Sequence, residues 1–186
     1  MNELSAILQQ ATAAIEPCYF QLNIDGGDPV FRERVYCYEL YHQMRSRWPE
    51  QSEFKLNGEI DKQAHPVLMK LGAAGAKPDL LVHTPGHMNG NHAILEVKHS
   101  TAAAGIRKDL RTLDLFAAKV GYRRAIYLIY GWESATQAVP KVLKVARHAN
   151  IGTAIEIWCH SDVGEAAMHV ASLLPSADGI AAFKLT

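Results

Sequence analysis

The chain has 186 residues, of which 48% are hydrophobic and 20% are charged, as in an ordinary globular protein. A chain of this length buries a core without disulfides or structural metals, so we expect a single domain over residues 1–186. Nineteen Lys and Arg residues balance nineteen Asp and Glu residues, which makes the formal net charge zero. This balance excludes a protein that binds nucleic acid through an overall basic charge, and any basic surface must be local.

The N-terminal segment carries Glu3 and lacks the basic segment and the long apolar run of a secretory signal. No stretch of the sequence approaches the length of a membrane span. The three cysteines, Cys18, Cys37 and Cys159, are odd in number and far apart, which predicts reduced thiols rather than disulfides or a zinc site. These features favour a cytoplasmic protein with no membrane partner.

The first half of the chain begins with predicted helices. Residues 2–15 predict a short amphipathic helix, and residues 25–29, with two glycines and a proline, predict a turn. Residues 31–48 predict a long helix that Pro49 ends. Bulky side chains occur on nearly every side of that helix, so we expect it to be buried among other elements.

Strands and helices then alternate. Strands are predicted over 54–60, 80–83 and 93–98, and Asn89-Gly90 predicts a two-residue hairpin turn between the last two. A helix, a strand, a helix and a strand follow over 101–119, 124–130, 134–148 and 151–158. The tail, 161–186, predicts one short helix and an irregular end. The order predicts an α/β fold with a mixed central sheet and helices on both faces.

Ionisable residues occur where the predicted strands are otherwise apolar. Asp79 stands at the start of one strand, and Glu96 and Lys98 are two residues apart in the most apolar strand. Since side chains alternate along a strand, Glu96 and Lys98 lie on one face, while Leu95 and Val97 face the opposite core. Burying a lone carboxylate or ammonium costs several kcal/mol unless the group is paired or bound to a metal. Asp79, on the neighbouring strand, is the predicted partner.

Two converging carboxylates suit a hard cation such as Mg²⁺ or Mn²⁺. Asp79, Glu96 and the backbone carbonyl of Val97 are the predicted metal ligands. A lysine beside such an ion, here Lys98, orients a water molecule, and the metal stabilises charge that develops on a phosphate. This combination of groups predicts phosphodiester hydrolysis.

The Pro-Asp pair at 78–79 and Glu96-Val97-Lys98, on adjacent strands of an α-β-β-β-α-β core, resemble the motif of the PD-(D/E)xK nuclease superfamily. This superfamily includes restriction endonucleases and Holliday-junction resolvases. The resemblance covers residues 31–158. It implies a restriction-endonuclease-like core and a metal-dependent endonuclease that acts on DNA in preference to RNA.

The resemblance also implies a glutamate on the first core helix that completes the site. Glu39 matches this position best, and Glu33 is an alternative that spacing does not exclude. The helix after the Glu96–Lys98 strand borders the site in this superfamily, which puts Lys108 and Asp109 near the substrate. Nuclease cores of this size commonly act as a homodimer or with a recognition partner.

Three other interpretations remain open. A catalytically inactive protein of the same fold, acting as a binding or assembly module, agrees with the neutral net charge. A transition-metal site is conceivable at His83, His87 and His92, because a two-residue turn would make His87 and His92 face each other. No further ligands are evident there, and solvated turn histidines are the simpler interpretation. Finally, Glu96 and Lys98 would form a simple surface ion pair if their strand were at an edge.

Overall fold

The computed structural model of the chain describes residues 3–58, 69–70, 77–99, 102–131, 135–175 and 182–185. Within these residues, no helix has the length and apolar character that a membrane crossing requires. The α-helices are α1 (Leu4–Ala13), α2 (Pro17–Phe20), α3 (Glu33–Ser46), α5 (Ala103–Leu115) and α6 (Ala135–Ala146). The strands are β1 (Leu22–Ile24), β2 (Gly27–Val30), β3 (Lys55–Asn57), β4 (Leu80–His83), β5 (Asn91–Lys98), β6 (Arg124–Tyr130), β7 (Ile155–His160), β8 (Met168–Leu174) and β9 (Ala182–Leu185).

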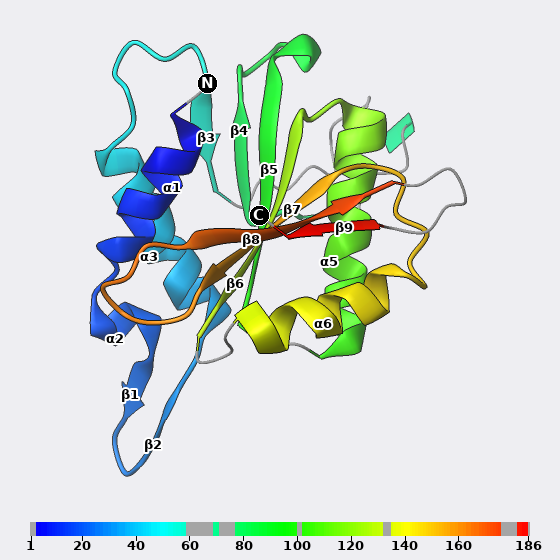
Figure 1. Ribbon diagram of the computed structural model, residues 1–186. Coiled ribbons are helices and arrows are strands. Elements are labelled where there is room, and N and C mark those ends of the chain that lie inside the picture. Colours follow the sequence, from blue (N-terminus) through cyan, green and yellow to red (C-terminus); the bar gives the residue numbers. More distant parts are fainter. Residues whose placement is uncertain are drawn as a thin grey trace.

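The centre of the molecule is a seven-stranded sheet with the strand order β3-β4-β5-β6-β7-β8-β9 (Figure 1). Strands β5, β6 and β7 run parallel to one another, whereas β3–β4, β4–β5, β7–β8 and β8–β9 are antiparallel pairs. The parallel pairs are connected through α5 and α6, as a parallel crossover requires. The predicted α/β class and the mixed central sheet are confirmed.

Helices cover both faces of this sheet and enclose two separate cores (Figure 1). Ile94, Tyr127 and Ile157 face the core beneath α5 and α6. Leu95 and Ile126, the sequence neighbours of two of these residues, face the core beneath α1 and α3. A strand covered on both faces needs apolar residues at successive positions, which explains the unbroken apolar runs of β5 and β6.

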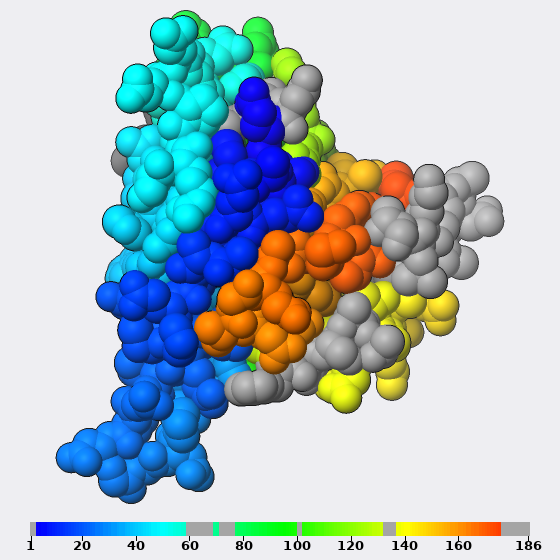
Figure 2. Space-filling view, turned by 60° about the vertical axis from the view of Figure 1, so that its left-hand side comes forward, coloured from blue at the N-terminus to red at the C-terminus, as the bar shows by residue number. Residues whose placement is uncertain are grey.

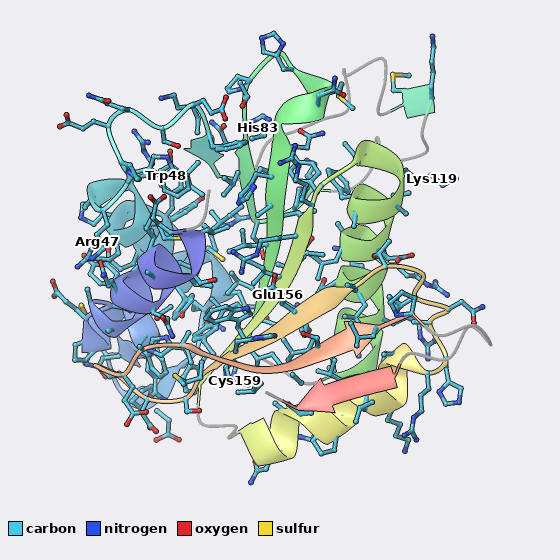
Figure 3. The ribbon with its side chains drawn as sticks, turned by 45° about the horizontal axis from the view of Figure 1, so that its top comes forward. Arg47, Trp48, His83, Lys119, Glu156 and Cys159 are labelled. Carbon is cyan, nitrogen blue, oxygen red and sulfur yellow. The ribbon has the colours of Figure 1, made fainter. Side chains whose placement is uncertain are left out.

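The first helix and the C-terminal part of the sheet lie side by side (Figure 2). Thr12 ends the buried face of α1, and its hydroxyl accepts a hydrogen bond of 2.8 Å from the backbone N–H of Ala167, just before β8. At the end of α3, the indole Nε1 of Trp48 donates to the carbonyl of Phe54 at 2.9 Å (Figure 3). This bond fixes the chain as it turns from α3 into β3.

Helix α3 is shorter than the predicted 31–48 and is buried on one side only. Tyr36, Leu40 and Met44, which are four residues apart, face the sheet and are fully buried. Tyr38 lies on a different side of the helix and is 64% exposed. The expectation that this helix is buried on all sides is therefore wrong, because some of its bulky side chains pack in the core and others are exposed at the surface.

The hairpin between β4 and β5 forms as predicted, but its turn differs. His83 pairs with Asn91, so the connection spans residues 84–90 and not two residues. The tight turn is at Pro85-Gly86, where Gly86 has a φ of 82° and the N–H of His87 donates to the carbonyl of Thr84 at 3.2 Å. Proline followed by glycine is favoured at the two central positions of such a turn, so the tight turn forms here and not at Asn89-Gly90. Asn89 and Gly90 belong instead to a 3₁₀ turn over Met88–Gly90.

Three other element predictions need correction. The segment 161–186 was expected to hold a short helix, but β8 and β9 extend the sheet there, with alternate residues Ala171 and Leu173 buried. The predicted turn over residues 25–29 is shorter, because residues 27–30 form β2 and pair with β1. The strand expected over 54–60 is described only as Lys55–Asn57, and residues 59–60 lie outside the described part of the chain.

Candidate functional site

Asp79, which directly precedes β4, meets Glu96 and Lys98 of β5 beside α5. Because Leu80 pairs with Leu95, the preceding Asp79 lies beside the end of β5. The backbone N–H of Val97 donates to Asp79 Oδ2 at 2.7 Å, which fixes this carboxyl against the strand. The sheet register therefore brings Asp79 next to Glu96, as the sequence predicts.

These side chains line a pocket of about 270 Å³. Strand alternation directs Glu96 and Lys98 into it from β5, while Leu95 and Val97 join the core on the opposite side. Among the described residues, the lining consists of seven charged residues and one uncharged residue, Val97: Glu33, Lys77, Asp79, Glu96, Val97, Lys98, Lys108 and Asp109. Strand β5 is in the middle of the sheet, so an edge-strand ion pair open to bulk solvent is excluded.

Lys98 is held between two carboxylates from different helices. Its Nζ lies 3.1 Å from Glu33 Oε2 on α3 and 3.6 Å from Asp109 Oδ2 on α5. Burial by itself lowers the pKa of Lys98, but Asp109 and Glu33 outweigh this effect and hold the pKa above its ordinary value. Lys98 is therefore a fixed cation at neutral pH and not a proton acceptor.

The acids of the pocket are hard to ionise together. Burial, followed by the charges of Asp79 and Asp109, raises the pKa of Glu96 well above its ordinary value. Burial also raises the pKa of Asp79, although the N–H of Val97 partly offsets it, and raises the pKa of Asp109 to about 6. The Asp79 and Glu96 carboxyls also interact, which lowers the pKa of Asp79 and raises the pKa of Glu96. Bound protons and the ammonium of Lys98 thus neutralise the negative charge of these carboxyls, as a bound metal cation also would.

The glutamate that α3 contributes is Glu33 and not Glu39. Glu33 Oε1 also accepts a hydrogen bond of 3.2 Å from the backbone N–H of His99, so it bridges two successive residues of the β5 end. Glu39 is not among the residues that line the pocket and accepts a hydrogen bond from Gln43 at 2.6 Å. Six residues along an α-helix turn the side chain by about 240°, so the two glutamates cannot serve the same site.

The donor chemistry of the pocket suits a hard divalent cation. Asp79, Glu96 and Asp109 offer only oxygen, and Asp109 Oδ2 is buried without a hydrogen-bond partner in the described structure. As the side chains stand, however, no three Asp, Glu, His or Cys residues of the described segments form a group that could hold a metal ion. Lys98 occupies the space between Glu33 and Asp109, so ion binding requires the carboxyls to exchange their present partners.

Two residues of the site have no distinctive signal in the sequence. Lys77 lines the pocket immediately before the Pro-Asp pair. Gly105, near the start of α5, lies directly against Lys98: a Cβ at this position would be 3.0 Å from Lys98 Cε. Only the packing of α5 on β5 reveals that this glycine makes room for the lysine side chain.

The histidines of the β4–β5 hairpin do not form a metal site. His83 Nε2 lies 2.8 Å from Asn57 Oδ1, and His92 is buried against the ring of Phe54, with centroids 4.9 Å apart. The observed register pairs His83 with Asn91, so His87 and His92 do not face each other as a two-residue turn would require.

No protein-family model matches the chain, and neither a curated protein nor a solved structure is significantly similar to it. The functional interpretation of the pocket therefore depends on its residues and their geometry.

Proposed function

We propose that this protein is a divalent-metal-dependent phosphodiester hydrolase, an endonuclease acting on DNA. The observation that carries the proposal is the meeting of Asp79, Glu96 and Lys98 in one small polar pocket. The element order α3-β3-β4-β5-α5-β6 supports a restriction-endonuclease-like core, because it is the α-β-β-β-α-β order of that superfamily. The motif and the order of elements are independent features that agree with each other.

In this proposal Asp79, Glu96 and the carbonyl of Val97 hold Mg²⁺ or Mn²⁺. When bound, the cation stabilises negative charge on the phosphate and lowers the pKa of a coordinated water molecule. Asp109 adds a further carboxyl to the donor set, and its buried Oδ2 has no other hydrogen-bond partner in the described structure. Glu33, and not Glu39, is the glutamate that α3 contributes in this proposal, and it holds Lys98 in place through the 3.1 Å contact.

Lys98 acts as a hydrogen-bond donor and a fixed positive charge. Its raised pKa keeps the ammonium protonated, so it orients the attacking water or a phosphate oxygen and does not remove a proton. Lys77 and Lys108 line the same pocket and add positive charge where a phosphate would approach. These local cations supply phosphate attraction that the neutral net charge of the chain does not supply.

The test is cleavage of plasmid, duplex and single-stranded DNA with Mg²⁺ or Mn²⁺, using wild type, Glu96→Gln and Lys98→Met. Each substitution is expected to reduce the cleavage rate by at least about a hundredfold. Glu39→Gln is the matched control, because it removes a carboxylate from α3 outside the pocket and should leave the rate unchanged. Thermal unfolding of each variant checks that the fold is retained. Cleavage that persists in EDTA, or in Glu96→Gln, would refute the proposal.

The alternative is a binding or assembly module with the same fold and no catalysis. The zero net charge favours it, and so does the lack of a preformed group of three metal ligands within the described residues. Isothermal titration calorimetry separates the two proposals: no heat on adding Mg²⁺ or Mn²⁺ favours the module. In either case, a homodimer or a recognition partner would extend the contact with DNA beyond this small pocket.

A further inference from the structure

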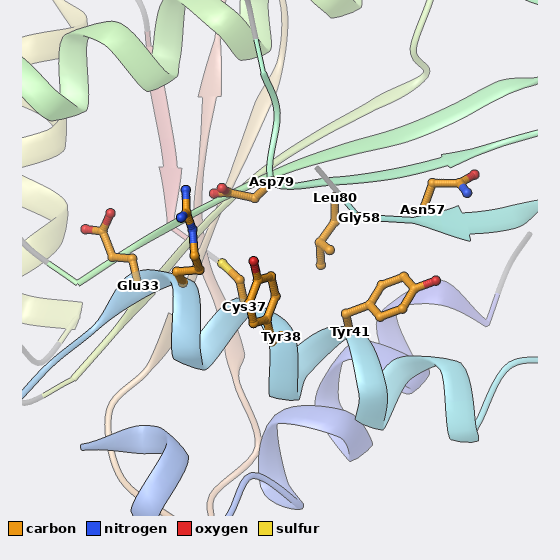
Figure 4. Close-up of a pocket in the computed structure, with 9 residues that line it drawn as sticks. Glu33, Cys37, Tyr38, Tyr41, Asn57, Gly58, Asp79 and Leu80 are labelled. Carbon is orange, nitrogen blue, oxygen red and sulfur yellow. The ribbon is translucent and has the colours of Figure 1, made fainter. Parts of the chain in front are cut away.

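A second, larger pocket adjoins the charged one and shares two of its residues. It has a volume of about 690 Å³, within the range of pockets that hold small organic groups. Glu33 and Asp79 line both pockets, so the two cavities adjoin at these residues. The larger pocket lies between α3 and the β3–β4 part of the sheet (Figure 4). A chain whose phosphate enters the charged pocket therefore has room for a neighbouring group beside α3.

The wall formed by α3 carries one cation and two aromatic rings. Arg34, Tyr38 and Tyr41 are separated by four and three residues, a spacing that puts them on one side of a helix, and all three line the pocket. Tyr38 rises from α3 toward the side of the pocket where Asp79 lies (Figure 4). It is 64% exposed, the largest exposed fraction among the large hydrophobic residues that the structure describes.

The packing of α3 against the sheet does not explain why an aromatic residue stands at position 38. The other face of the helix already buries Tyr36, Leu40 and Met44, so Tyr38 is not needed for the core. An exposed aromatic ring beside a phosphate-binding site offers a flat apolar surface to a base. Stacking of a base on such a ring contributes about 1–3 kcal/mol and does not depend on the base's identity.

We infer that the larger pocket binds one strand of nucleic acid with an unstacked base on the ring of Tyr38. The inference rests on the proposed function and narrows its substrate to single-stranded or locally unpaired nucleic acid. A base inside a duplex is stacked on both sides and reaches Tyr38 only if it is flipped out, which costs a few kcal/mol. Arg34, one turn before Tyr38, meets the backbone phosphate of the stacked nucleotide, and the adjoining phosphate enters the charged pocket.

The experiment measures binding in EDTA, where cleavage does not occur, by the fluorescence anisotropy of a labelled single-stranded DNA. Tyr38→Ala is expected to raise the Kd about five- to a hundredfold, the equivalent of one stacked base. Tyr38→Phe keeps the ring and is expected to bind like wild type. Tyr19→Ala is the matched control, because Tyr19 is 40% exposed on α2 and does not line the pocket. A matched duplex is expected to bind more weakly than the single strand.

A photocrosslink gives a readout that a structural defect does not imitate. Single-stranded DNA with 5-iodouracil is expected to crosslink to Tyr38, as located by mass spectrometry. The inference is overturned if wild type does not bind the single strand, if Tyr38→Ala binds as tightly as wild type, if Tyr38→Phe is as weak as Tyr38→Ala, or if the duplex binds more tightly.

Failure of this inference and failure of the proposed function give different results. If wild type cuts duplex DNA in a Glu96-dependent manner while Tyr38→Ala is fully active, the hydrolase stands and the stacking site does not. If single-stranded DNA binds through Tyr38 but is never cut, the stacking site stands and the hydrolase does not.

Discussion

Replacing Asp109 by Asn is expected to stabilise the metal-free protein at neutral pH. Burial raises the pKa of Asp109 from 3.8 to about 6, even though Lys98 lies 3.6 Å away. Between pH 4 and 6 the folded protein therefore binds a proton that the unfolded chain has released. Above pH 6 the folded state holds an ionised carboxylate that costs free energy, and an amide of the same shape removes this cost.

The magnitude follows from the pKa difference. About two pH units correspond to about 3 kcal/mol, which is the full gain expected for Asp109→Asn at pH 8. The gain shrinks to about half at pH 5 and to less than about a fifth at pH 4, because the wild-type side chain then becomes protonated in the folded and finally also in the unfolded state. At pH 8 the melting temperature is expected to rise by roughly 6–12 °C. Lys98 keeps a partner in the variant, since Glu33 remains 3.1 Å away.

The measurement is urea unfolding of wild type and Asp109→Asn in EDTA at pH 8, 5 and 4. Asp114→Asn is the matched control on the same helix. Asp114 Oδ1 accepts hydrogen bonds from the backbone N–H groups of Gly152 and Thr153, so its replacement is expected to destabilise the protein by about 1–2 kcal/mol. If Asp109→Asn is less stable than wild type at pH 8, or if its gain is the same at pH 4, the assigned electrostatic cost is wrong.

Two further predictions concern the folded scaffold. Burial lowers the pKa of His160 from 6.5 to about 4, so the protein loses stability as the pH falls from 6.5 toward 4. The free energy of unfolding lost between pH 7 and pH 5 is expected to be about 2 kcal/mol smaller in His160→Asn than in wild type. Urea unfolding at both pH values measures this difference, and parallel pH profiles of the two proteins would contradict the prediction. That variant should also be less stable at pH 7, because it loses the 2.7 Å hydrogen bond with Tyr36. Gly131→Ala is expected to cost roughly 2–4 kcal/mol, because Gly131 has a φ of 110° and a Cβ would be 2.8 Å from the ring of His99. Gly164 also has a positive φ, but a Cβ there would meet no atom within 4 Å, so Gly164→Ala introduces backbone strain without a clash. Thermal melting of the two variants compares their losses of stability, and equal losses would rule out a contribution from the clash at Gly131.

Local patterns in the sequence were sufficient for features that depend on the backbone alone. The alternation of a strand places Glu96 and Lys98 in one pocket and Leu95 in the opposite core, as predicted. Long apolar runs identified the strands that helices cover on both faces. The strand ends, the 3₁₀ turn at Met88–Gly90 and the tail were less predictable, because neighbouring strands decide whether a short apolar segment such as β8 joins the sheet.

The remaining features of the site depend on contacts between segments that are far apart in the chain. Glu33 reaches Lys98 across 65 residues, and the sequence left Glu33 and Glu39 as alternatives. The rotation of α3 about its axis decides between them, and the burial of Tyr36, Leu40 and Met44 sets that rotation. The same rotation turns Tyr38 outward to the larger pocket.

The sequence by itself determined the strand that carries the acid and the lysine, the adjoining aspartate and the α/β class, because each follows from spacing along the backbone. Only the tertiary structure decided which helical residues complete the pocket, where Gly105 leaves room for Lys98 and how the aromatic wall adjoins the carboxyls. The physical reason is that a helix offers a different residue with every rotation of about 100°, and its packing against the sheet selects one of them.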